Sequence, residues 1–168
     1  MKVKAIVDED FSDYKKASMF IGTLYCGGKC CIEAGIPISV CQNDSWREKP
    51  ALDLPDDKII ERYLSNPLTE AIVFGGLEPF EQYPELLKFI KLLREKYKCN
   101  DDVVIYTWFY KDELDIEIKE LIMYPNIVFK FGRYVPNSTK RFDEVLGVEL
   151  ASQNQYGERI SWDGSNAE

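Results

Sequence analysis

Short apolar runs alternate along this chain with segments whose apolar residues recur at helical spacing, and this alternation restricts the possible folds most strongly. The apolar runs predict strands at residues 18–22, 71–74, 103–108 and 127–130. The stripes between and after them predict helices over residues 57–65, 83–98 and 114–122. Nearly continuous apolar strands separated by helices are typical of a parallel sheet that helices cover. We therefore predict an α/β fold with a mostly parallel sheet.

The chain length of 168 residues is typical of one domain, and 45% hydrophobic residues suffice for a buried core. We predict a single domain over residues 1–162 and a short, polar, flexible tail over residues 163–168. Residues 43–56 carry two prolines and predict a polar loop. The acidic residues 8–10 predict a solvated turn.

The complete absence of histidine excludes several kinds of active site. Neither a Ser-His-Asp nor a Cys-His nucleophile can form, and a metal must be held by thiolates or carboxylates. The 21 basic and 29 acidic residues give a formal net charge of −8, which argues against sequence-independent nucleic-acid binding. No apolar run approaches the roughly 20 residues that span a bilayer, and the N-terminal residues lack a secretory signal. We therefore predict a cytoplasmic protein without membrane or nucleic-acid partners, whose thiols stay reduced.

Four of the five cysteines fall in one short segment, as Cys26, Cys30, Cys31 and Cys41. Thiolates are soft ligands that suit iron–sulfur clusters, zinc or Cu(I). The spacing leaves three interpretations open. Cys26, Cys30 and Cys41 can hold a cluster, whereas a zinc site adds Cys99 and uses either Cys30 or Cys31. In the third interpretation the cysteines are small apolar residues that lie together by chance.

The cysteine segment and a double glycine each follow a predicted strand directly. Residues 26–41 come after the 18–22 strand, and Gly75-Gly76 come after the 71–74 strand. Ligands of open α/β sheets bind beyond the carboxyl ends of the strands. Because parallel strands end at the same edge, we expect both features at one edge of the sheet.

The cysteine segment resembles the cluster-binding loop of the radical-SAM superfamily. Cys26-x3-Cys30 follows a predicted strand, and Cys41, with Asn43 two positions later, supplies the third thiol. In the superfamily two residues usually separate the second and third cysteines, whereas ten residues do so here. The resemblance implies a 4Fe–4S cluster held by Cys26, Cys30 and Cys41, with Cys31 as the alternative second ligand. It also places Asn43 among the cofactor-binding residues.

The turn after the second predicted strand resembles another motif of that superfamily. Gly75-Gly76-Leu77-Glu78 matches the start of its Gly-Gly-Glu-Pro sequence with one inserted leucine. The resemblance implies that the backbone of this turn hydrogen-bonds the amino group of S-adenosylmethionine (SAM). Thr107, near the end of the next predicted strand, becomes a candidate polar contact to the same cofactor.

The end of the chain resembles one group within the superfamily, the small activating proteins of anaerobic ribonucleotide reductase. Gly132-Arg133-Tyr134 precedes residues 147–155 in the order of that group's Gly-Lys/Arg-aromatic and Gly-Ser-x-Asn-Gln segments. The resemblance covers about residues 17–160 and implies an open partial (β/α) barrel of radical-SAM type. Arg133 lies near the end of the 127–131 strand, where we favour a surface ion pair, with a contact to the cofactor carboxylate or to a partner protein as the alternative.

The same resemblance implies an anaerobic oxidoreductase that activates another enzyme. The reduced 4Fe–4S cluster would cleave SAM to methionine and a 5′-deoxyadenosyl radical, which abstracts a hydrogen atom. The implied partners are a glycyl-radical enzyme as protein substrate and an electron donor such as flavodoxin or ferredoxin. The alternative is a non-catalytic zinc- or iron–sulfur-binding module that recognises a protein. Cys99 distinguishes the enzyme from the binding module. A four-thiolate site needs Cys99 as a ligand, whereas in the enzyme we expect it to be a surface thiol that binds no metal.

Overall fold

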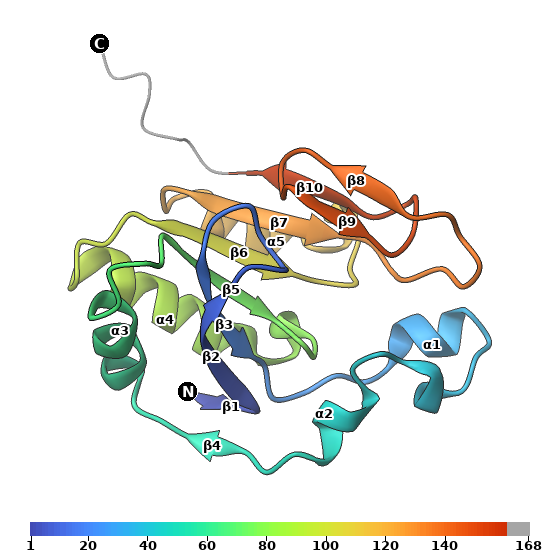
Figure 1. Cartoon of the computed structure of the whole chain (residues 1–168), viewed down its shortest axis with the longest axis horizontal. Helices are drawn as coiled ribbons and strands as arrows, with labels where there is room; N and C mark the ends of the chain where they lie inside the picture. Colours follow the sequence, from blue (N-terminus) through green and yellow to red (C-terminus); the bar gives the residue numbers. More distant parts are fainter. Residues whose placement is uncertain (161–168) are drawn as a thin grey trace.

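A six-stranded sheet forms the centre of the molecule, in the order β10-β7-β6-β5-β3-β2 (Figure 1). The computed structural model describes residues 1–160. The strands of the central sheet are β2 (Ala5–Asp10), β3 (Ser18–Gly22), β5 (Ala71–Gly75), β6 (Asp102–Tyr106), β7 (Ile127–Phe131) and β10 (Tyr156–Arg159). Two further pairs are β1 (Lys2–Val3) with β4 (Leu52–Asp53), and β8 (Arg141–Asp143) with β9 (Val148–Leu150). The expected tail at 163–168 lies outside the described residues, so the domain boundary stays a prediction.

The helices of the described residues are short, apart from α4. The α-helices are α1 (Lys29–Glu33), α2 (Asp44–Glu48), α3 (Asp56–Leu64), α4 (Tyr83–Glu95) and α5 (Asp115–Leu121). The 3-10 turns are η1 (Ile38–Val40), η2 (Pro79–Gln82) and η3 (Lys111–Glu113). No helix within residues 1–160 combines the length and the apolarity needed to cross a bilayer.

The four strands predicted from their apolar runs are confirmed, and they lie side by side in parallel. β3 pairs with β5, β5 with β6, and β6 with β7, all in the same direction. The edge strands β2 and β10 run antiparallel to their neighbours. The predicted α/β class with a mostly parallel sheet is therefore confirmed. The sheet of residues 1–160 ends at two edges and shows no barrel, so the radical-SAM-like partial barrel stays a proposal.

Helices α3, α4 and α5 cover only one face of this sheet. Their apolar stripes pack against strand residues that share one face, such as Ile72 and Phe74 of β5. Phe89 of α4 meets the Phe74 ring edge-on, with 5.3 Å between the ring centroids. Each such fully buried side chain contributes about 1.5–3 kcal/mol through burial. Val73, which points to the opposite face, belongs to a second cluster with Tyr14, Leu146 and Leu150. That face is covered by loops, by the β8–β9 pair and by Trp46 of the short helix α2.

Two segments that the sequence predicted to be irregular are regular in the structure. Residues 8–10 belong to β2, an edge strand, where Asp8 forms an ion pair with Arg62 at 2.6 Å. The stretch 43–56 is not a plain loop, because it contains helix α2, strand β4 and the start of α3. Both predictions were wrong for one reason. Half-exposed or very short elements carry little hydrophobic periodicity, and their long-range partners decide their structure.

Candidate metal centre and cofactor pocket

The cysteine loop and the glycine turn leave the sheet at the same edge, as the strand directions predicted. Gly22, the last residue of β3, lies opposite Gly75, the last residue of β5. Thr23 fastens the two chain segments together. Its backbone N–H and its hydroxyl both donate to the Gly75 carbonyl, at 2.9 and 3.1 Å. Loop and turn therefore start from one rigid point at the carboxyl ends of two adjacent parallel strands.

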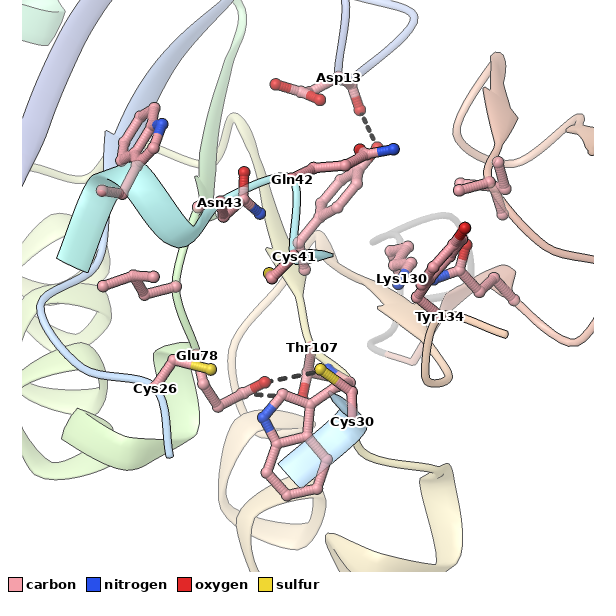
Figure 2. Close-up of a pocket in the computed structure, with 18 of the residues that line it drawn as sticks. Asp13, Cys26, Cys30, Cys41, Gln42, Asn43, Glu78, Thr107, Lys130 and Tyr134 are labelled. Carbon is pink, nitrogen blue, oxygen red and sulfur yellow. Dashed lines mark hydrogen bonds between the residues drawn. The ribbon is translucent and has the colours of Figure 1, made fainter. Parts of the chain in front are cut away.

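A pocket of about 500 Å³ opens at this edge and collects nearly all the residues that the sequence singled out. Figure 2 shows Cys26, Cys30 and Cys41 around this pocket, together with Glu78 and Thr107. The predicted site residues that line it are Cys26, Cys30, Cys41, Asn43, Gly76, Leu77, Glu78 and Thr107. Cys31, the alternative ligand, lines it as well. Gly75 does not, because its carbonyl and backbone are engaged inside the fold.

The cysteines of the loop are placed by two short turns of helix. α1 carries Cys30 and Cys31, and Cys41 directly follows η1. Cys31 is only 3% exposed, whereas Cys26, Cys30 and Cys41 are half-buried. Burial raises the pKa of Cys26 and of Cys30 to about 11. These thiols are therefore protonated at neutral pH unless the positive charge of a metal displaces their protons.

The chemistry of the loop fits an iron–sulfur cluster. In the described residues 1–160, no three Cys, Asp or Glu side chains meet closely enough to coordinate a metal ion. However, soft thiols surround one pocket, and unpartnered hydrogen-bond donors lie beside them. The Nε and Nη2 atoms of Arg47 and the indole Nε1 of Trp108 are buried and make no hydrogen bond. Thiolate ligands with buried N–H donors nearby suit an anionic sulfide cluster.

Cys99 lies at the amino ends of the parallel strands, whereas the cysteine loop lies at their carboxyl ends. It precedes β6, whereas the loop follows β3, and the two strands run in the same direction. Its carbonyl accepts a hydrogen bond of 2.6 Å from Arg94, and its side chain is buried. The expectation of a surface thiol was therefore wrong. The fold also separates Cys99 from the other cysteines, so it does not complete a four-thiolate zinc site with them.

Comparison with known proteins bears directly on this pocket. The family model for the 4Fe-4S single cluster domain matches residues 36–155. The chain belongs to this family. The matched segment contains Cys41 and Cys99 and begins after Cys26, Cys30 and Cys31. No curated protein and no solved structure matches the chain. Membership of the 4Fe-4S single cluster domain family indicates that the protein binds an iron–sulfur cluster.

In this 4Fe-4S single cluster domain, the glycines at the sheet edge make room for an aromatic ring. Gly76 has φ +79°, and a Cβ on it would lie 3.0 Å from the indole of Trp46. A Cβ on Gly22 would lie 2.1 Å from the same ring. Trp46 belongs to α2, which begins three residues after Cys41. The indole therefore packs the segment after Cys41 against the glycine turn. A Cβ at Gly22 would overlap the ring, whereas at Gly76 the left-handed φ favours glycine in addition to the close contact.

Glu78 of the turn is a buried structural carboxylate. It is 1% exposed and accepts hydrogen bonds from the Phe80 N–H at 3.0 Å and the Trp108 N–H at 2.9 Å. The Thr107 hydroxyl donates to it at 2.8 Å and accepts the Phe109 N–H at 3.0 Å. Burial nevertheless raises the pKa of Glu78 to about 7. The Thr107 hydroxyl therefore has protein partners both as a donor and as an acceptor. Thr107 directly follows β6, so its bond to Glu78 ties the turn to the end of this strand.

Lys130 is a pocket residue that the sequence reasoning missed. It lies on β7, is 9% exposed, and donates from Nζ to the Gly132 carbonyl at 2.9 Å. Burial lowers the pKa of Lys130 to about 8, although the Glu78 carboxylate acts in the opposite direction. The available signal was the one charged residue in the apolar run Ile127-Val128-Phe129-Lys130. A cation inside a buried strand is rarely tolerated without a polar role.

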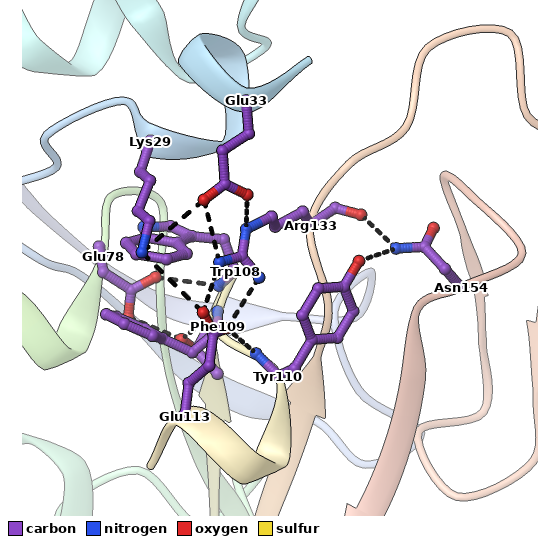
Figure 3. Close-up of polar contacts among 10 residues, drawn as sticks. Lys29, Glu33, Glu78, Trp108, Phe109, Tyr110, Glu113, Arg133 and Asn154 are labelled. Atoms are coloured by element: carbon purple, nitrogen blue, oxygen red, sulfur yellow. Dashed lines mark hydrogen bonds and ion pairs between the residues drawn. The ribbon is translucent and has the colours of Figure 1, made fainter.

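Arg133 is neither in the pocket nor on the surface. It is 7% exposed, with both Nη atoms bonded to the Glu113 carboxylate at 2.7 and 2.6 Å (Figure 3). It also forms an ion pair with Glu33 of α1. Its guanidinium lies 5.0 Å from the ring centroid of Trp108 and 4.7 Å from that of Tyr110. Arg133 therefore fastens α1, which carries two cysteines, to the edge of the sheet.

We expect Arg133→Met to loosen α1 selectively. Removing a buried, bidentate ion pair should speed amide hydrogen exchange in residues 29–33 about tenfold or more, with little change in α4. Hydrogen exchange read by mass spectrometry measures this. Arg159→Met is the matched control, because it removes a 2.8 Å ion pair with Asp102 that does not contact α1. Unchanged exchange in α1 would contradict the role assigned to Arg133.

Proposed function

We propose that this protein is a radical-SAM enzyme with a 4Fe–4S cluster on Cys26, Cys30 and Cys41. One observation carries the proposal. The three thiols and residues 76–78 of the glycine turn line a single pocket at the carboxyl ends of the parallel strands, in a chain of an iron–sulfur family. When bound, the cluster supplies the electron that cleaves SAM to methionine and a 5′-deoxyadenosyl radical. The protein supplies ligation, orientation and exclusion of water.

The carbonyls that the turn leaves free support a site for the amino group of SAM. The Gly75 carbonyl is occupied, because it accepts hydrogen bonds from Thr23 and from the Leu77 N–H at 3.0 Å. In the described residues, the carbonyls of Gly76 and Leu77 accept no hydrogen bond, and both residues line the pocket. These two carbonyls are the acceptors that we assign to the ammonium group.

Lys130 is the group that we assign to the carboxylate of the cofactor. Its ammonium carries three N–H donors, of which the Gly132 carbonyl takes one. It lines the same pocket as the free carbonyls. A buried cation with donors to spare recognises a carboxylate strongly, because the charge-assisted bond forms away from bulk water.

We further propose a glycine Cα–H of a glycyl-radical enzyme as the hydrogen donor, and flavodoxin or ferredoxin as electron donor. The order of the two C-terminal segments, Gly132-Arg133-Tyr134 followed by residues 147–155, supports this class of partner. The open sheet supports it too, because a protein substrate must approach the pocket directly.

The proposed activity is tested by anaerobic reconstitution with iron and sulfide, followed by SAM and dithionite. We expect 5′-deoxyadenosine and methionine in equal amounts, measured by liquid chromatography. Lys130→Met should raise the SAM concentration for half-maximal turnover about tenfold or more, because it removes the cation opposite the carboxylate. A 4Fe–4S protein that forms no 5′-deoxyadenosine would instead be a non-catalytic cluster module. Recovery of one zinc ion and no cluster would overturn the assignment altogether.

A further inference from the structure

Arg47 places a positive charge against the cysteine loop. It belongs to α2, six residues after Cys41, and its Nη1 donates to the Cys26 carbonyl. Its Nη2 lies 3.2 Å from the position of a Cβ on Gly28, the residue whose N–H points to the Cys26 sulfur at 3.4 Å. The guanidinium therefore lies against the backbone of residues 26–28, beside the first cysteine of the loop.

The charge of Arg47 is only partly compensated by the protein. Its one carboxylate neighbour in residues 1–160 is Asp44, 3.4 Å from Nε and itself 39% exposed. Both Nε and Nη2 are buried, and neither makes a hydrogen bond. Buried guanidinium donors without acceptors are costly, so such a group usually serves a nearby negative charge.

We propose that Arg47 raises the reduction potential of the cluster bound in this loop. A 4Fe–4S cluster on three thiolates is anionic, and one-electron reduction makes it more so. A fixed cation nearby stabilises the reduced form more than the oxidised form. Net charge and hydrogen bonding around the sulfurs are among the main determinants of cluster potentials. The inference rests on the proposed ligands, but it does not require that SAM be cleaved.

A purely structural role predicts a different outcome from an electrostatic one. If Arg47 only braces the loop through the Cys26 carbonyl, its loss lowers cluster occupancy without a consistent effect on potential. If its charge acts on the cluster, removing Arg47 and removing Asp44 must shift the potential in opposite directions. Asp44→Asn leaves the guanidinium in place and takes away its counter-charge. The two variants therefore separate charge from bracing.

The test is a redox titration of the reconstituted full-length protein, followed by EPR in the absence of SAM. At the wild-type midpoint, Arg47→Gln should lower the ratio of reduced to oxidised cluster about tenfold, a shift of roughly 59 mV to more negative potential. Asp44→Asn should shift the midpoint to more positive values, and Arg47→Lys should stay near wild type. Lys49→Gln is the matched control, because it removes an exposed cation that lies 4.3 Å over the Trp46 ring.

Opposite shifts for Arg47→Gln and Asp44→Asn would support the electrostatic role. Equal midpoints for the wild type and both variants, or shifts of the same sign, would overturn it. Iron and sulfide content per chain is measured first, so that the comparison uses loaded protein. If Arg47→Gln does not hold a cluster, Asp44→Asn alone decides. The EPR titration contains no SAM, so its result does not depend on turnover. If the separate turnover assay yields no 5′-deoxyadenosine, the proposed enzyme activity fails, but the role of Arg47 is unaffected.

Discussion

Cys41→Ala is expected to abolish cluster binding, whereas Cys99→Ala should leave it intact. Cys41 lines the pocket with Cys26 and Cys30, and three thiolates are the fewest that hold the cluster proposed here. Cys99 lies at the other edge of the sheet, with its backbone held by Arg94. Iron and sulfide per chain after anaerobic reconstitution, together with the visible absorption of the cluster, measure both variants.

The same measurement resolves the choice between the two adjacent cysteines of α1. Cys30 is half-buried and lines the pocket, whereas Cys31 is buried, and this burial raises the pKa of the Cys31 thiol. We expect Cys30→Ala to lose the cluster and Cys31→Ala to keep most of it. Equal loss in the Cys41 and Cys99 variants would contradict the three-thiolate site and favour a four-thiolate module.

Glu78→Ala should destabilise the fold more than any other single change in the turn. The substitution leaves the N–H groups of Phe80 and Trp108 and the Thr107 hydroxyl without their common acceptor in a buried site. Unsatisfied buried donors cost about 1–3 kcal/mol each, so we expect a loss of about 3–5 kcal/mol in the free energy of unfolding. Urea denaturation of the cluster-free protein, followed by circular dichroism, measures it.

Two variants test whether the hydrogen bonds of Glu78 cause this loss. Glu85→Ala removes an exposed carboxylate at the start of α4 and should change the free energy of unfolding by less than about 0.5 kcal/mol. Thr107→Val removes one of the three donors, together with the acceptor of the Phe109 N–H, and should cost about 1–2 kcal/mol. A Glu78→Ala protein as stable as the Glu85→Ala protein would show that the carboxylate does not hold the turn.

The parallel core of the fold could be predicted from the sequence because its strands are buried on both faces. In such strands nearly every side chain is apolar, so β3, β5, β6 and β7 appear as continuous runs. Helices α3 and α4 were predicted because each buries a single stripe of regular spacing. The edge strands β2 and β10 lack such a signal, since their partners and not their own composition fix their structure.

The residue types of the candidate site, and the end of the sheet where it forms, could be predicted from the sequence. Thiol ligands are a property of residue type, and strand direction places Cys26 and Gly76 at the same end of a parallel sheet. The roles of the surrounding side chains, in contrast, depend on contacts that form only when the chain folds. Arg133 pairs with Glu113, Lys130 lines the pocket, and Trp46 packs against the glycines. The reason is physical, because the partners of a buried charge or ring come from segments that are distant along the chain.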